Sequence, residues 1–197
     1  MTIYFSMAAF ALATSITPGP VNIVAFTNGA QVGFYASLRH VTGATVGFTL
    51  LLILVGLGLN QVLTWWPGLT AVILWAGVVF LLYMAYQLAV DSGQWQPDQG
   101  MKRPSYWYGA GLQWLNPKAW LAATAGMGAF VGDSNGERLW LFALIYFVIC
   151  YVSVAMWAYA GTMLSRFLQR AQTVQYFNRL MALLLVLSAS YLLAEGV

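Results

Sequence analysis

Ser15-Ile16-Thr17-Pro18-Gly19-Pro20-Val21-Asn22 is the stretch that decides the fold. It lies within an apolar segment, because residues 1 to 38 contain no charged side chain, and about 20 such residues are enough to cross a bilayer as a helix. Pro18 and Pro20 lack a backbone donor, so carbonyls about one turn earlier lose their partners. In hydrocarbon such groups are tolerated only where protein or a water-filled cavity receives them. The stretch therefore predicts a broken membrane helix beside a polar cavity, with a simple proline kink as the alternative.

A second stretch repeats this pattern in the other half of the chain. Leu115-Asn116-Pro117-Lys118-Ala119-Trp120 also places a proline inside an apolar segment, and Pro117 follows Pro18 by 99 positions in a chain of 197 residues. The same offset superposes several further identical residues. These are Gly29 on Gly128, Ala30 on Ala129, Val32 on Val131, Gly33 on Gly132 and Arg39 on Arg138. Self-similarity at a fixed offset indicates a chain built from two related halves.

The composition places this chain in a membrane. Hydrophobic residues make up 61% of the sequence and charged residues 7%, whereas soluble domains carry about 25% charged residues. The apolar runs are continuous over about 20 residues, which is typical of helices and not of a membrane barrel. The net charge of +3 is scattered and forms no basic patch, so a nucleic-acid partner is not expected. The single cysteine, Cys150, excludes an intramolecular disulfide and is expected to pack as a small apolar residue.

The apolar segments predict an all-α integral membrane protein with six transmembrane helices. They cover about 3–27, 40–60, 69–90, 107–131, 139–164 and 177–194. Residues 1–90 would form the first three-helix repeat, residues 91–106 a polar cytoplasmic linker loop, and residues 107–197 the second three-helix repeat. Because each repeat has an odd number of helices, the two repeats would have inverted topology, as in many transporters that work by alternating access.

The basic residues predict how the chain is oriented. Six of them fall on one face of the predicted topology and only Arg138 on the other, and cytoplasmic loops carry the excess of Lys and Arg. The first face would therefore be cytoplasmic, with both termini outside. Its six residues are Arg39, Lys102, Arg103, Arg166, Arg170 and Arg179.

Several motifs resemble the LysE/RhtB family of amino-acid exporters. They are Thr17-Pro18-Gly19-Pro20, the glycines at 33, 43 and 47, Leu74-Trp75-Ala76-Gly77 with Leu81-Leu82-Tyr83, and Asn116-Pro117-Lys118. The resemblance covers essentially the whole chain. It implies a multi-pass protein of the bacterial inner membrane, with both termini periplasmic, that exports amino acids by proton-linked antiport without a cofactor.

The candidate substrate-binding residues lie at the two breaks. Helix ends opened there would offer amide donors to a carboxylate and carbonyls to an ammonium group, which are the two charged groups of an amino acid. Lys118 is the most informative residue, since a cation at membrane depth is costly; the alternative is that its long stem reaches the headgroup level. The candidates are Thr17, Pro18, Gly19, Pro20, Asn22, Asn116, Pro117 and Lys118.

The charged and titratable residues limit which classes of substrate the protein could bind. No Asp or Glu lies mid-segment, which disfavours a strongly cationic substrate such as lysine. Ligand clusters for a metal are missing too, so no metal is expected. The candidate substrates are neutral amino acids or close derivatives, of the homoserine, threonine, leucine or cysteine type. His40 and Asp91 are the candidate proton-coupling residues, and for His40 the alternative is a histidine at the membrane interface.

Other features have a structural interpretation that competes with a functional one. Gly29-x-x-x-Gly33, Gly43-x-x-x-Gly47 and Gly128-x-x-x-Gly132 predict close helix packing. Helix packing or an interface is also the first explanation for the polar and aromatic residues Tyr83, Tyr86, Gln87, Gln113, Thr124 and Trp157. An enzyme is not expected, because no His-Glu-x-x-His or Gly-x-Ser-x-Gly motif occurs. Two alternative functions are compatible with the sequence: a membrane scaffold without transport and an exporter of another small polar solute. The sequence is also compatible with a homo-oligomer.

Overall fold

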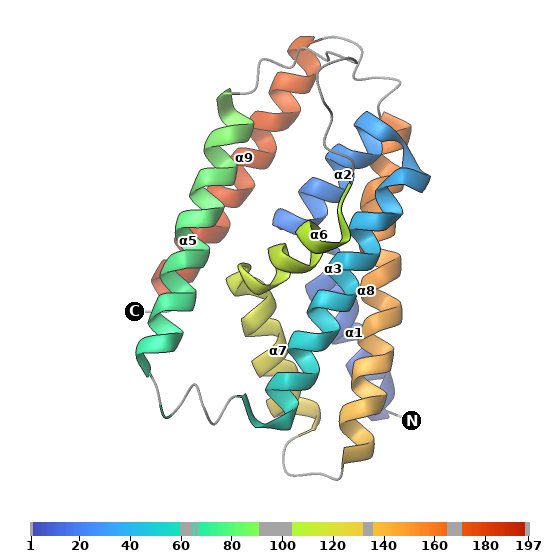
Figure 1. The fold of residues 1–197 in the computed structure, drawn as a ribbon, viewed down its shortest axis with the longest axis vertical. Coiled ribbons are helices and arrows are strands. Elements are labelled where there is room, and N and C mark those ends of the chain that lie inside the picture. Colours follow the sequence, from blue (N-terminus) through green and yellow to red (C-terminus); the bar gives the residue numbers. More distant parts are fainter. Residues whose placement is uncertain are drawn as a thin grey trace.

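A computed structural model describes residues 2–59, 65, 67–90, 104–131, 136–164 and 171–195 (Figure 1). Throughout these ranges the regular elements are helices, without a β-strand. In chain order they are α1 (Thr2–Ile16), α2 (Pro20–Val32), α3 (Phe34–Leu54), the π-helical turn η1 (Val55–Leu59), α5 (Pro67–Val90), α6 (Tyr106–Trp114), α7 (Pro117–Phe130), α8 (Gly136–Leu164) and α9 (Ala171–Glu195). The all-helical fold class is confirmed.

The six apolar segments correspond to six helical stretches, of which the first and the fourth are broken where the sequence predicted. α1 and α2 are bent by 63° across their break, and α6 is separated from α7 by Leu115 and Asn116. The second stretch begins at Phe34, six residues earlier than predicted, because Gly33 (φ 83°) supplies the turn after α2. The sixth begins at Ala171, also six residues early. The predicted linker loop of residues 91–106 lies mostly outside the described residues.

Successive stretches alternate in direction. In Figure 1 the α1–α2 stretch runs upward, α3 downward, α5 upward, α6 across and α7 downward, α8 upward and α9 downward, so that both termini lie in the lower half of the view. Arg39 and Arg179 belong to helices that begin at the upper end, whereas Arg138 is near the start of α8 at the lower end. Lys102, Arg103, Arg166 and Arg170 lie outside the described residues. The alternation agrees with an even number of passes.

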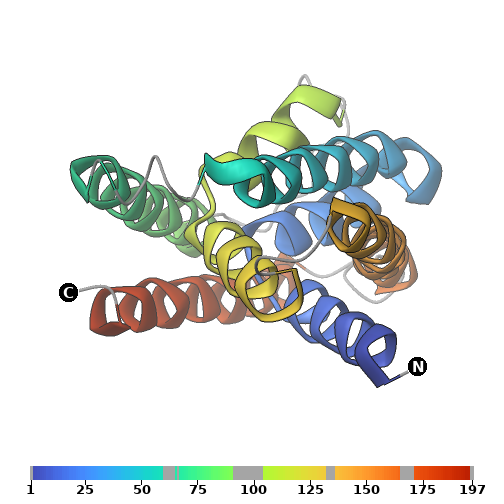
Figure 2. The ribbon, with the colours of Figure 1, turned by 90° about the horizontal axis from the view of Figure 1, so that it is seen from below.

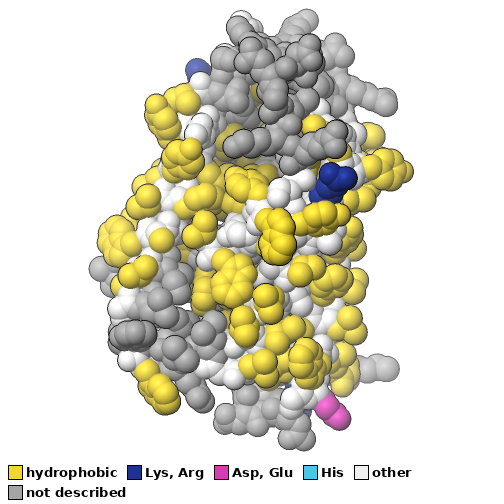
Figure 3. Space-filling view, viewed as in Figure 1, with side chains coloured by type: hydrophobic (Ala, Val, Ile, Leu, Met, Phe, Trp, Pro, Cys, Tyr) yellow, Lys and Arg dark blue, Asp and Glu magenta, His cyan; other side chains and the backbone are white. Residues whose placement is uncertain are grey.

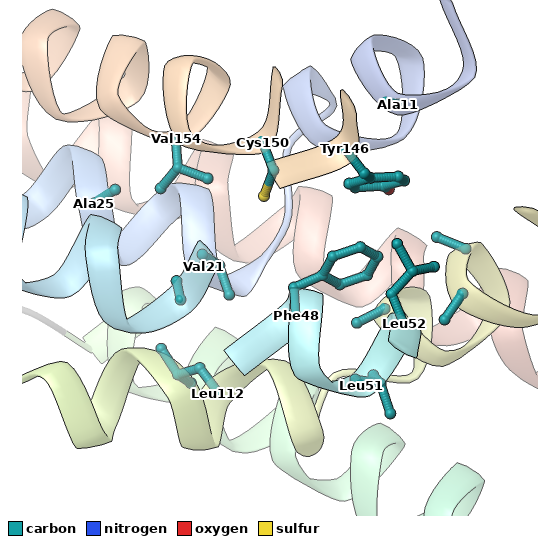
Figure 4. Packing of buried hydrophobic residues seen from close by; sticks show 14 of the residues in the cluster. Ala11, Val21, Ala25, Phe48, Leu51, Leu52, Leu112, Tyr146, Cys150 and Val154 are labelled. Carbon is teal, nitrogen blue, oxygen red and sulfur yellow. The ribbon is translucent and has the colours of Figure 1, made fainter. Parts of the chain in front are cut away.

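Helices of the two halves pack against each other. α3 packs on α6 and α8, α8 also packs on α1 and α2, and α5 packs on α9. Viewed from below in Figure 2, α5 and α9 form a pair beside the other helices. The buried core lies mainly between α1, α2, α3 and α8, where large side chains such as Phe142, Leu51 and Leu52 have no exposed surface (Figure 4). Cys150 is buried in this core, as predicted.

Close helix packing through glycine is confirmed at three of the predicted positions. A Cβ on Gly29 would overlap the carbonyl of Ala158 in α8, one on Gly43 would overlap that of Tyr106 in α6, and one on Gly47 would meet the backbone of Ala110. The prediction is wrong for Gly33 and Gly128, where a Cβ would meet no atom within 4 Å, and Gly132 lies outside the described residues. Gly33 serves a turn instead of a contact.

The outer surface suits a lipid environment. Large apolar side chains such as Phe5, Leu144 and Val152 are more than half exposed, and hydrophobic atoms cover much of the face in Figure 3. Among the described residues, two helical stretches are long and apolar enough to cross a membrane, Phe34–Gly58 and Gly136–Leu164, and a third if α1 and α2 count as one span. The helix Trp75–Val90 is apolar but shorter. The six crossings and the inverted repeat stay predictions.

Candidate functional site

The first break frees a group of main-chain carbonyls between α1 and α2. Gly19 is extended (φ −169°, ψ 174°) and Pro20 opens α2, so the hydrogen-bond ladder is interrupted from Ser15 to Pro18. Asn22 Nδ2 donates to the carbonyl oxygens of Ser15 and Thr17, at 2.8 Å each. Trp157 Nε1, from α8, donates to the Ile16 carbonyl at 3.0 Å. Side chains thus replace the lost backbone donors.

The start of α2 is left open to a ligand. Gly19 precedes it and makes no side-chain cap. Pro20 has no N–H, so the first available donors are the N–H groups of Val21 and Asn22, which have no partner one turn earlier in a helix. These donors and the helix dipole form a partial positive charge that favours an anion.

The second break is stabilised by residues close to it in sequence. Asn116 caps α7, because its Oδ1 accepts from the Lys118 N–H at 3.2 Å. Trp120 Nε1 donates to the Trp114 carbonyl at 2.9 Å. Pro117 occupies the first helical turn, where a missing N–H costs nothing, and its ring lies against Gly77 of α5.

Lys118 joins the second break to the first. Its Nζ donates to the carbonyls of Thr17 (3.0 Å) and Pro18 (3.5 Å) and to the Thr17 hydroxyl. The ammonium therefore points to the neighbouring break. A lysine that reaches for the headgroups would instead point along its own helix toward an end of the molecule. Within the described ranges Lys118 has no carboxylate partner, so its charge is met by neutral oxygens alone.

Two cavities meet at these residues. A cavity of about 400 Å³ is lined by Thr17, Pro18, Gly19, Pro20, Asn116 and Lys118 together with leucines of α5, α7 and α9. A smaller cavity of about 40 Å³ extends between α1, α2, α3, α8 and the second break, and includes Asn22 in its wall. Gly19, Asn116 and Lys118 line both cavities.

Seven of the eight predicted site residues thus line one or both cavities. Pro117 is the exception, since it is buried against α5 and lines neither. Asn22 is 5% exposed, and its side-chain amide donates to the carbonyls of the break, so its main role in this structure is to stabilise the bend.

His40 is buried inside the molecule. Because α3 begins at Phe34, His40 lies almost two turns inside the helix and has no exposed surface. Its Nε2 is 3.1 Å from the carbonyl of Val21, in the first turn of α2. Its role in proton coupling stays a prediction, and Asp91 lies outside the described residues.

Sequence reasoning missed several residues of the site. Thr14 and Tyr146 line the small cavity but carry no local motif, and Ser15, which also lines it, opens the first proline stretch without being among the candidates. Gln113 and Trp157 are polar or aromatic residues inside apolar segments, which is the one signal that marked them. Gln113 lines the small cavity and Trp157 holds the first break, whereas Tyr83, Tyr86 and Gln87 are exposed on α5.

The chain is similar to known proteins over nearly its full length. The profile of the LysE type translocator family matches residues 12–196. A cysteine/O-acetylserine efflux protein of Klebsiella pneumoniae is 28% identical over 200 residues, covering 98% of each chain. A protein of the same name from Escherichia coli K12 is 27% identical over 191 residues, covering 95% of this chain and 96% of the relative. No solved structure matches the chain.

Proposed function

The chain belongs to the LysE type translocator family, and on this premise we propose that it exports neutral amino acids or close derivatives from the cytoplasm. The protein is then a multi-pass membrane transporter that works by proton-linked alternating access. Its relatives named as cysteine/O-acetylserine efflux proteins match over nearly their whole length. They support a small amino acid or amino-acid derivative as the substrate.

The observation that carries this proposal is the environment of Lys118. Its ammonium lies at the meeting point of the two breaks, where the described residues provide no carboxylate and only neutral oxygens accept its hydrogen bonds. An α-carboxylate would supply the missing negative charge and would also receive the open N–H groups at the start of α2. The substrate ammonium would take the carbonyls of Thr17 and Pro18 as Lys118 turns to the carboxylate. A site of this kind needs only one charged side chain, that of Lys118, to bind a zwitterion.

The same arrangement disfavours a cationic side chain on the substrate. The residues that line the two cavities include no Asp or Glu. A second ammonium, such as that of lysine, would be buried next to Lys118 without a counter-charge, which is costly. A neutral side chain avoids this cost.

Alternating access is supported by the packing of the two halves. α1 packs on α8 as α6 packs on α3, and the equivalent helices α3 and α8, and α5 and α9, also pack together. The pattern is closest for these helices, because α2 packs more extensively on α8 than its counterpart α7 does on α3. This pattern is expected of two repeats related by a two-fold axis in the membrane plane. In the proposed topology, six crossings place both termini in the periplasm and the end with Arg39 and Arg179 in the cytoplasm.

Proton linkage would act through His40. Its ring is bonded to the Val21 carbonyl, so a change of its protonation alters a contact at the start of α2, next to the first break. A collapsed pH gradient would then lower the export rate, and His40→Gln would remove this dependence. A rate that responds to the gradient equally in both proteins would argue against His40.

The experiment is uptake of labelled amino acids into inverted inner-membrane vesicles, where export becomes accumulation. Lys118→Ala is expected to lower the initial rate about tenfold to a hundredfold, the size of a lost charge-assisted hydrogen bond. Asn116→Ala should lower it less. Arg138→Ala removes one positive charge at the far end of the molecule and should transport like the parent.

Two outcomes would overturn the proposal. Equal accumulation in the parent, Lys118→Ala and Asn116→Ala would remove the site from the breaks. Absence of accumulation by the parent for every amino acid tested would favour a scaffold or an exporter of another solute.

A further inference from the structure

The small cavity lies in the interior of the molecule, next to the breaks. Figure 4 shows part of its surroundings, where Tyr146, Cys150 and Val154 of α8 point toward Phe48 of α3 and Val21 of α2. All five residues line the cavity. Because α1, α2 and α3 belong to the first half and α8 to the second, both halves contribute to its wall.

Polar groups in this wall are ready to bind a ligand. Ser15 is 8% exposed, and within the described part of the chain its hydroxyl makes no hydrogen bond of good geometry, with the Tyr146 hydroxyl and the Cys150 thiol as its polar neighbours. A buried hydroxyl without a partner is unfavourable, so a group that enters the cavity gains a bond there. On the same wall the hydroxyls of Thr14 and Tyr146 are bonded to each other at 2.6 Å. The Gln113 side chain also lines the cavity.

The size of the cavity limits what can enter. A volume of about 40 Å³ holds about three water-sized atoms, since one needs roughly 10–15 Å³ by this measure. Serine and cysteine have side chains of two heavy atoms, and threonine and homoserine have three. Leucine has four and offers no hydrogen-bonding group to Ser15. The cavity therefore fits a short polar side chain.

The position of the cavity connects it to the charged groups of the substrate. Gly19, Asn116 and Lys118 form its rim and also line the large cavity. An amino acid held at this rim by its carboxylate and ammonium can place its side chain in either cavity. Apart from the residues of the two breaks, the large cavity is walled by Leu81, Leu121, Leu184 and Leu187, whose side chains offer a polar group no hydrogen bond.

We propose that the small cavity is the side-chain subsite of the transporter and that Ser15 is its specificity-determining residue. The substrates are neutral amino acids whose side chain has at most three heavy atoms and ends in a hydroxyl or thiol. This inference rests on the proposed function, because it assumes an amino acid at the rim. The large leucine-walled cavity then serves as the path to the rim.

The test measures selectivity and not total activity. Inverted vesicles with the parent, Ser15→Ala or Ser153→Ala are given labelled serine, cysteine, alanine and leucine. Ser15→Ala should lower the serine and cysteine rates threefold to tenfold relative to the alanine rate, as expected for one lost hydrogen bond. Ser153 is also a buried serine with an unpartnered hydroxyl, but it lines neither cavity. Ser153→Ala should therefore keep the parental ratios.

A binding measurement on the purified protein gives a second readout. Serine should raise the melting temperature of the parent and of Ser153→Ala in detergent, and should raise that of Ser15→Ala less, because only ligand bound to the folded state contributes. Leucine should raise none of them to the same degree at equal concentration.

The inference is overturned if the parent transports leucine as fast as serine, or if Ser15→Ala slows all four amino acids equally. In both cases the parent still transports, so the proposed function survives. If the parent transports none of the amino acids, the proposed function fails and the subsite with it.

Discussion

The two breaks occupy equivalent positions in the two halves, yet they are stabilised in different ways. At the second break Asn116 and Trp120 supply the hydrogen bonds from the same segment. At the first, Asn22 supplies two hydrogen bonds from the same segment, but Trp157 and Lys118 also reach the freed carbonyls from 141 and about 100 positions away along the chain. The second break is therefore satisfied within its own segment, whereas the first also draws on the opposite half. A repeated sequence pattern thus fixes where a helix breaks but not how the broken ends are satisfied.

The helices that follow the breaks differ as well, and this gives the largest expected effect. The offset of 99 pairs Gly29 with Gly128, but only Gly29 lies against another backbone. Gly29→Val should force α2 away from α8 and lower the free energy of unfolding by about 3 kcal/mol. Gly128→Val should change it little. Melting of the two variants in detergent checks this, and an equal loss in both would mean that the halves pack alike.

The two asparagines at the breaks should differ less strongly. Asn22→Ala leaves the buried carbonyl of Ser15 without its side-chain donor and the Thr17 carbonyl with Lys118 alone, which should cost about 2 kcal/mol of stability. Asn116→Ala removes one helix cap and should cost about 1 kcal/mol. Denaturant unfolding of both variants and the parent measures the difference. A larger loss for Asn116→Ala would reverse the comparison drawn between the breaks.

The smallest effect is expected at the hydroxyl that Lys118 contacts. Thr17→Val keeps the shape of the side chain but leaves Lys118 with main-chain carbonyls alone, so the apparent affinity for substrate should change twofold to fivefold. Thr124→Val is the matched control, because the Thr124 hydroxyl bonds to the Trp120 carbonyl within α7 and lines neither cavity. Concentration dependence of vesicle uptake measures both, and identical curves would show that this contact is dispensable.

The sequence was sufficient to predict the breaks, because proline and glycine act on the backbone locally. It could not predict the partners of the freed carbonyls, since Trp157 reaches Ile16 only through the packing of α8 on α2. It leaves an interface position open for His40, because the apolar pattern starts the second helix six residues later than Phe34 and gives no sign of the turn at Gly33. The small cavity was out of reach, since Ser15, Gln113 and Tyr146 come from three distant segments.

The pairing of helices across the halves has a consequence for the chain as a whole. α5 relies on α9, α6 on α3, and α1 on α8. A fragment that ended after α5 would leave uncovered the faces of α1, α3 and α5 that pack on the second half. Those faces would have to be covered by another chain, so the covalent connection between the halves spares each helix the search for its partner.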